Sequence, residues 1–266
     1  MSNLLYFPII KWKAGEYNAL FQLSDYAKKI ICPIIELTSV DYDFEDRKPK
    51  KTLDEHLEKI GDRLYKKWGN GLALVDVNNI DYPSNKDLYI IKIFELYRKS
   101  GCNVVPIINF NESLLNVYRD IIHQDLHGVA IRLKRQDLAS PNFQEELNNL
   151  ITRLSVSADK VDLIVDLERF VLLNNDETKT YNYIYNKLLI IPNINSWRSL
   201  IIAGSTFPED VVLDESQKRY EWLLYKDIIK RSKSKRVIAF SDYTVFPNGH
   251  TAPLDMRVIT YKAKFR

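Results

Sequence analysis

The sequence has little of what marks a secreted or membrane-spanning protein. Only two cysteines, Cys32 and Cys102, occur in 266 residues, and each begins a predicted strand, on strands that should not be neighbours. A disulfide is therefore not expected, and a reducing, cytoplasmic location fits best. The apolar run at the N-terminus is short, contains Pro8 and is closed by Lys11, so it makes a poor signal peptide. No apolar stretch approaches the roughly 18 residues of a membrane span, so no membrane partner is expected.

The sequence also has only a small excess of positive over negative charge, and it lacks the common catalytic motifs. The net charge is +3 and the isoelectric point is near 8.6, a balance too mild to favour a nucleic-acid partner. The chain has no P-loop, no G-x-G-x-x-G, no G-x-S-x-G and no C-x-x-C. His123 and His127 share an H-x-x-x-H spacing, but no glutamate follows the first, so the zinc-protease motif is absent.

What the sequence does have is a regular alternation of short apolar runs and amphipathic segments. The runs are rich in Ile, Val and Leu and are apolar in both alternating phases, which is typical of strands buried on both faces. Eight of them occur, at residues 7–10, 32–35, 72–75, 104–108, 129–131, 163–165, 200–203 and 237–240. Helical patterns lie between them, at residues 17–29, 53–68, 88–97, 114–122, 143–154, 180–190 and 219–229.

Eight evenly spaced strand–helix units predict parallel strands joined by right-handed crossovers. We therefore predict a single (β/α)₈ barrel domain over residues 1–266, with an open doubly wound sheet as the alternative. Residues 256–264 resemble a further strand after the eighth, either capping the barrel or pairing with residues 243–246.

Polar side chains follow the predicted strands on their C-terminal side. In chain order these are Lys11, Lys13, Glu36, Asp76, Asn78, Asn109, Arg132, Lys134, Asp166, Glu168, Ser205, Asp242 and Tyr243. Many share the two-residue period of a strand, so one strand face would bring them together at the C-terminal mouth, where barrel enzymes place their catalytic groups. The alternative is a structural plug in which Arg132 pairs with Asp76 or Asp166, because barrel interiors also hold ion pairs.

The residue types in this set suggest chemistry on a phosphoester or nucleotide. Glu36, Asp76, Asp166 and Asp242 could hold Mg²⁺ or Mn²⁺ through oxygen ligands or act as a general base. Lys11 and Arg132 would stabilise charge on phosphate oxygens. The remaining members of the set, Lys13, Asn78, Asn109, Lys134, Glu168, Ser205 and Tyr243, would bind the ligand, with Ser205 in a loop region that barrels often use for phosphate.

Two other uses of the same residues stay open. A pair of carboxylates could cleave a glycosidic bond by acid–base catalysis. The charges could also bind without turnover, in a protein that sequesters a host protein or a small signalling ligand. No spacing in the sequence separates these hypotheses from the metal-dependent hydrolase.

The sequence resembles the "beta protein" family of bacteriophages and bacteria along nearly its whole length. The resemblance rests on residues 6–20, on Pro33 with Glu36, on Asp76, Arg132 and Asp166 at strand ends, on the glycine–serine pair at 204–205, and on Asp242 with Tyr243. It implies a phage or prophage origin and a role in conflict between phage and host, and it carries over no catalytic residues. Family members continue past the last strand with tryptophan-, arginine- and histidine-containing motifs that this sequence lacks. If those motifs complete a site or a partner surface, the resemblance implies a minimal or partly degraded member.

Overall fold

The structure, a computed structural model, describes residues 4–207, 218–232 and 237–244. Its main sheet has eight strands in the order β1-β2-β5-β6-β7-β8-β9-β10, and every neighbouring pair is parallel. The strands are β1 (Ile9–Lys11), β2 (Ile34–Glu36), β5 (Ala73–Asp76), β6 (Val104–Asn109), β7 (Val129–Lys134), β8 (Val161–Arg169), β9 (Ser199–Ser205) and β10 (Ala239–Asp242). All eight predicted strands are confirmed.

The first and last strands meet, which closes the sheet into a barrel. Isolated parallel bridges join Tyr6 to Phe240 and Ile9 to Tyr243. Backbone hydrogen bonds run from the Phe7 N–H to the Phe240 carbonyl at 2.9 Å and from the Thr244 N–H to the Ile9 carbonyl at 3.1 Å. The seam is held by these few bonds rather than by a full ladder. The predicted (β/α)₈ barrel is therefore confirmed, and the doubly wound alternative is wrong.

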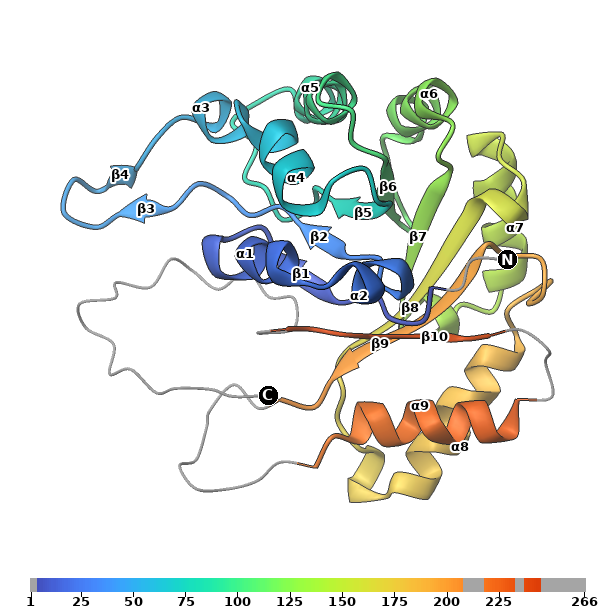
Figure 1. Cartoon of the computed structure of the whole chain (residues 1–266). Coiled ribbons are helices and arrows are strands. Elements are labelled where there is room, and N and C mark those ends of the chain that lie inside the picture. Colours follow the sequence, from blue (N-terminus) through green and yellow to red (C-terminus); the bar gives the residue numbers. More distant parts are fainter. Residues whose placement is uncertain (1–3, 208–217, 233–236, 245–266) are drawn as a thin grey trace.

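Helices connect the strands and cover the outside of the barrel (Figure 1). They are α1 (Ala14–Gln22), α2 (Asp25–Ile30), α3 (Leu53–Leu57), α4 (Ile60–Trp68), α5 (Lys86–Lys99), α6 (Leu115–Asp125), α7 (Phe143–Leu154), α8 (Glu177–Leu189) and α9 (Tyr220–Arg231). In the part of the chain that is described, no helix combines the length and the hydropathy needed to cross a membrane. Both cysteines are buried and free, as the sequence predicts.

The predicted helix over residues 53–68 is broken in two. Lys59 leaves the helical conformation between α3 and α4. Two residues later Gly61 lies so close to α5 that a Cβ there would be 2.4 Å from the Leu96 carbonyl oxygen. We attribute the break to the packing of this segment against α5. The helical period of the sequence gives no information about such tertiary contacts.

One feature outside the barrel was not predicted. Strands β3 (Tyr42–Asp43) and β4 (Lys48–Pro49) form a small antiparallel hairpin in the charged segment after β2, and it projects away from the barrel (Figure 1). The predicted extra strand at residues 256–264 lies outside the described residues.

Two apolar layers fix which face of each strand points inward. A large layer packs between the strands and the helices, and a smaller one fills the barrel. The inner layer includes Ile9, Ile34, Leu74, Ile107, Ala130 and Ile164. Two residues further along their strands come Lys11, Glu36, Asp76, Asn109, Arg132 and Asp166. Because side chains alternate along a strand, these polar residues share the inward face and sit at its C-terminal end.

Candidate functional site at the barrel mouth

The centre of the mouth is a buried cluster around Arg132, here called the Arg132 cluster and made of Glu36, Asp76, Arg132, Asp166 and Tyr243. Arg132 Nη1 donates to Glu36 Oε1 at 2.9 Å and to Asp76 Oδ2 at 2.7 Å, and Nε donates to Asp166 Oδ2 at 2.8 Å. All four charged side chains are at most 3% exposed. The cluster joins strands β2, β5, β7 and β8 across the interior of the barrel.

Tyr243 links the two sides of the Arg132 cluster. Its hydroxyl accepts from Arg132 Nη2 at 2.8 Å and donates to Asp166 Oδ2 at 2.6 Å. Burial raises the pKa of Tyr243 above its usual value, with the Asp166 charge acting in the same direction, so the hydroxyl keeps the proton that it donates.

The remaining carboxylate oxygens of Asp76 and Asp166 are also occupied. Asp76 Oδ1 accepts from the backbone N–H and the side-chain amide of Asn78, both at 2.9 Å. Asp166 Oδ1 accepts from the Glu168 N–H at 2.8 Å. Glu168 has a left-handed φ of 52° at a register shift in β8. A bulge at that point turns the Glu168 N–H onto Asp166, and such bulges occur often beside functional sites.

Glu36 is the exception within the Arg132 cluster. Its Oε2 atom is buried and has no hydrogen-bond partner in the described part of the chain. Burial raises the pKa of Glu36 to about 7, with the neighbouring charges of Asp76 and Asp166 adding to the rise and Arg132 opposing it. Glu36 can therefore gain or lose a proton near neutral pH.

A second layer of inward-facing polar residues, here called the rim, lies outside the Arg132 cluster. Its members are half-buried: Lys11, Asn78, Asn109, Lys134 and Glu168. Lys11 is in register with Glu36, and Asn109 is in register with Arg132. Lys134 Nζ lies 2.8 Å from Glu168 Oε1. The sequence predicted each of these positions, and the structure brings them to the same end of the barrel.

Asp242 does not belong to this site, which corrects the sequence prediction. Its neighbours Ser241 and Tyr243 take the inward phase of β10. Phe240, in the same phase as Asp242, packs against Trp222 and Tyr225 of α9. Asp242 therefore faces outward, where it accepts from the Tyr6 hydroxyl at 2.6 Å and from Arg219 Nη2 at 2.8 Å.

Lys13 also lies apart from the Arg132 cluster, whereas Ser205 takes the inward phase of β9, two residues after Ala203 of the inner apolar layer. Lys13 is exposed and lies 3.6 Å from Asp41. Ser205 is buried, and its hydroxyl oxygen accepts from the Phe207 N–H at 3.2 Å. The next backbone N–H, that of Thr206, donates to the Glu221 carboxylate at 3.2 Å. The Glu221 carboxylate therefore already binds one backbone donor of the loop in which phosphate binding was predicted.

The carboxylates do not form the predicted metal site. A guanidinium already binds one oxygen of Glu36, Asp76 and Asp166, so those three oxygens are not available to coordinate a metal ion together. Over the described ranges, no group of three or more His, Cys, Asp or Glu side chains is arranged to hold a metal ion. The Arg132 cluster thus fits the alternative in which Arg132 pairs with the carboxylates.

Glu16 is a residue of the mouth that the sequence analysis missed. It lies in the first turn of α1, directly after β1, and its Oε2 atom is buried without a partner among the described residues. Burial raises the pKa of Glu16 to about 7, and hydrogen bonds from Lys11 and Thr244 oppose the rise. A carboxylate in the first helical turn after a strand was the available signal, because that turn starts at the mouth of a barrel.

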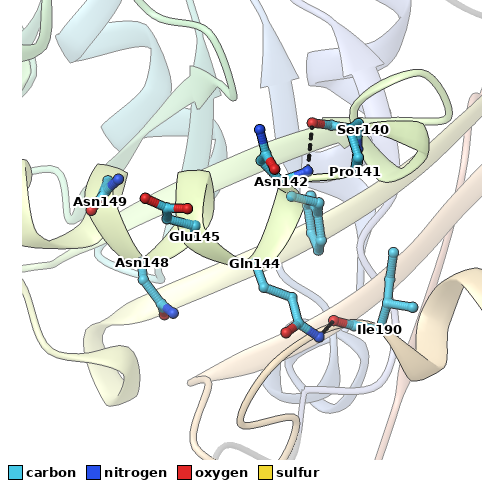
Figure 2. Close-up of a pocket in the computed structure, with 9 residues that line it drawn as sticks. Ser140, Pro141, Asn142, Gln144, Glu145, Asn148, Asn149 and Ile190 are labelled. Atoms are coloured by element: carbon cyan, nitrogen blue, oxygen red, sulfur yellow. Dashed lines mark hydrogen bonds between the residues drawn. The ribbon is translucent and has the colours of Figure 1, made fainter.

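A surface pocket of about 560 Å³ lies elsewhere, at the start of α7 (Figure 2). Its lining includes the exposed Asn142, Gln144 and Asn148, and Gln144 donates to the Ile190 carbonyl at 2.7 Å. None of its residues belongs to the Arg132 cluster or the rim, so it is separate from the mouth.

Removing the Tyr243 hydroxyl tests how firmly the Arg132 cluster is held. Tyr243→Phe is expected to lower the free energy of unfolding by about 2 kcal/mol, because two hydrogen bonds to charged groups are lost in a buried site. The matched control is Tyr225→Phe, which removes one bond to the Ile238 carbonyl and should cost about 1 kcal/mol or less. Urea unfolding measures both, and equal losses would contradict a special role for Tyr243.

Solved structures are similar to this chain at low sequence identity. The biosynthetic arginine decarboxylase from Campylobacter jejuni aligns with a TM-score of 0.52 and 14% identity, over 90% of this chain and 39% of that chain. A mutant tryptophan synthase alpha-subunit from Pyrococcus furiosus gives 0.48 and 8%, over 91% and 87%. The catalytic module of a family 98 glycoside hydrolase from Streptococcus pneumoniae gives 0.42 and 9%, over 91% and 46%.

The likeness to the arginine decarboxylase concerns the fold alone, and this chain spans well under half the length of that protein. No curated protein matches the sequence. A family model does: the one described as Beta protein matches residues 6–264, nearly the whole chain, and the protein therefore belongs to the Beta protein family.

Proposed function

We propose that the protein binds a small polar ligand at the C-terminal mouth of its barrel, between the rim and the Arg132 cluster, without a metal ion. The observation that carries this proposal is the Glu36 Oε2 atom, which is buried with no hydrogen-bond partner in the described residues. Buried polar atoms are nearly always paired, and an orphan in a native structure calls for an explanation. A ligand atom at the mouth would supply the missing partner.

The position of the rim supports the same proposal. Lys11, Asn78 and Asn109 are half-buried polar residues on the inward face, at the end of the barrel where ligands bind in this fold. The Arg132 cluster beneath them is held by many bonds, so the rim has a rigid base on which to position a ligand.

The role favoured by this geometry is sequestration rather than metal-dependent hydrolysis, because three of the four proposed metal ligands bind Arg132 instead. Action in conflict between phage and host remains a prediction of the family resemblance.

The test is native mass spectrometry of the protein with the small-molecule fraction of a bacterial extract, in the presence of a chelator. We expect a bound species of unchanged mass, and weaker capture by the double variant Lys11→Ala/Asn78→Ala. The control is Lys99→Ala/Lys230→Ala, which removes two exposed side chains in the last turns of α5 and α9, at the end of the barrel opposite the rim, and should capture normally. A ligand held equally by both double variants would contradict the proposal, and so would capture that requires Mg²⁺ or Mn²⁺.

A second candidate is acid–base cleavage of a glycosidic bond with Glu36 as the proton donor. The specific observation is that the pKa of Glu36 is raised to about 7, which lets one carboxyl carry a proton at neutral pH. The same experiment separates the candidates, because cleavage would release products of lower mass whereas sequestration returns the ligand unchanged.

A further inference from the structure

The charges of the Arg132 cluster do not balance. Three carboxylates, from Glu36, Asp76 and Asp166, face a single guanidinium, and all four are at most 3% exposed. If every carboxyl were ionised, the Arg132 cluster would hold two negative charges in excess. Uncompensated charge is costly in a buried site, because the surroundings are far less polarisable than water.

Among the described residues, the charged side chains around the Arg132 cluster do not remove this excess. Lys134 is paired with Glu168, and Lys13 is exposed and paired with Asp41. Lys11 lies next to Glu36 in register, but the charge of Lys11 also acts on Glu16. Tyr243 contributes a neutral hydroxyl. Each further cation of the rim therefore has an anion beside it.

One carboxylate oxygen in the Arg132 cluster lacks a positively charged or hydrogen-bonding partner among the described residues. Within the described ranges, every carboxylate oxygen in the Arg132 cluster accepts a hydrogen bond except Glu36 Oε2. In the absence of another cation, a proton on Glu36 offsets part of the excess, in keeping with the raised pKa of this carboxyl. A positively charged donor group would supply both the missing charge and the missing hydrogen bond.

We infer that the ligand of the mouth is a cation, with an ammonium or guanidinium group that binds Glu36. This inference rests on the proposed binding function and gives its ligand class. It departs from the phosphate expected from the sequence, because an anion would add to the negative excess. Binding of the cation displaces the proton of Glu36 into the buffer.

The test is isothermal titration calorimetry with four probes: putrescine, methylguanidinium, glucose and inorganic phosphate. We expect the two cations to bind and the neutral and anionic probes not to bind. Since one proton leaves a group of pKa about 7, the Kd of a cation should be about 30-fold lower at pH 8.5 than at pH 5.5. Buffers of different ionisation enthalpy report the released proton directly.

The variant Glu36→Gln keeps the size of the side chain and removes its charge. It should weaken cation binding at pH 8.5 at least about tenfold and abolish the pH dependence. Glu145→Gln, an exposed change on α7, is the matched control and should bind as the wild type does. Comparison of the four probes on the wild-type protein tests the inference without any variant.

The outcomes separate the two proposals. Binding of phosphate or glucose without binding of either cation would overturn the cationic ligand and leave the mouth as a ligand site. Cation binding that is unchanged in Glu36→Gln would also overturn the inference. If no probe binds and the extract yields no ligand, the proposed function fails as well.

Discussion

Replacing Arg132 with methionine is expected to lower the free energy of unfolding by about 3–5 kcal/mol, which is the usual cost of removing one partner from a buried ion pair. Methionine fills much of the same volume, so the loss comes mainly from charge rather than from a cavity. Glu36, Asp76 and Asp166 would each lose a charged donor at 2.7–2.9 Å while remaining buried. Urea unfolding at pH 7.5 measures the effect.

The matched control is Arg119→Met. The Arg119 side chain is 41% exposed and its Nε lies 3.8 Å from Asp120 Oδ1, an ion pair that contributes little in water. The control should change the free energy of unfolding by less than about 0.5 kcal/mol. A similar small change for Arg132→Met would show that the carboxylates do not depend on the guanidinium.

The loss in Arg132→Met should depend on pH in a definite direction. Without Arg132, buried carboxyls hold their protons more tightly in the folded than in the unfolded protein, because burial disfavours the charged form. The deficit is therefore greatest at high pH and shrinks as the pH falls and the carboxyls become protonated. Adding Glu36→Gln, Asp76→Asn and Asp166→Asn to Arg132→Met should recover part of the stability at pH 7.5, since the uncompensated charges are then gone.

The sequence was sufficient to place most of the mouth. Asp76 with Asn78, and Arg132 with Lys134, follow apolar runs at the period of a strand, and the carboxyl ends of parallel strands meet at one end of a barrel. Their shared phase predicted that they lie together on one strand face, but the sequence did not show whether that face points inward. In the structure this face points inward, because Leu74 and Ala130, in the same phase, belong to the apolar layer inside the barrel.

Asp242 shows where that reasoning fails. Its strand carries polar residues in both phases, Ser241 in one and Asp242 in the other. The inward phase is fixed by the seam between Ile9 and Tyr243, two residues far apart in the sequence. A shift of one residue in that seam would exchange the faces, so local pattern alone could not decide between them.

The sequence could not show whether the carboxylates bind a metal ion or Arg132, for a related reason. Glu36 and Arg132 are 96 residues apart, and their contact depends on the width of the barrel and on the length of the arginine side chain. Four carboxylates at strand ends are equally consistent with a metal and with a guanidinium among them. Only the distances show that Arg132 takes the central position.

The second large effect expected is a dependence of stability on the ionisation of Glu36. The pKa of this carboxyl is about 7 in the folded protein and near its usual 4.5 when unfolded. The folded state therefore binds the proton more tightly, and stability falls as the pH rises from 4.5 through 7. The full change corresponds to about 3 kcal/mol, from about 1.4 kcal/mol per pKa unit.

The variant Glu36→Gln isolates this contribution, because an amide resembles the protonated acid at every pH. Between pH 4.5 and 8.5 the free energy of unfolding of the variant should gain about 3 kcal/mol relative to the wild type. Glu145→Gln, on the exposed face of α7, should follow the wild type within about 0.5 kcal/mol.

Glu16→Gln serves as an internal comparison. The pKa of Glu16 is also raised, but Glu16 is only half-buried. The free energy of unfolding of Glu16→Gln should therefore gain less than that of Glu36→Gln over the same pH range. If the free energy of unfolding of Glu36→Gln tracks the wild type at every pH, the proton is not on Glu36. The negative excess of the Arg132 cluster would then have to be offset in the free protein by another group, and the argument for a cationic ligand would lose its basis.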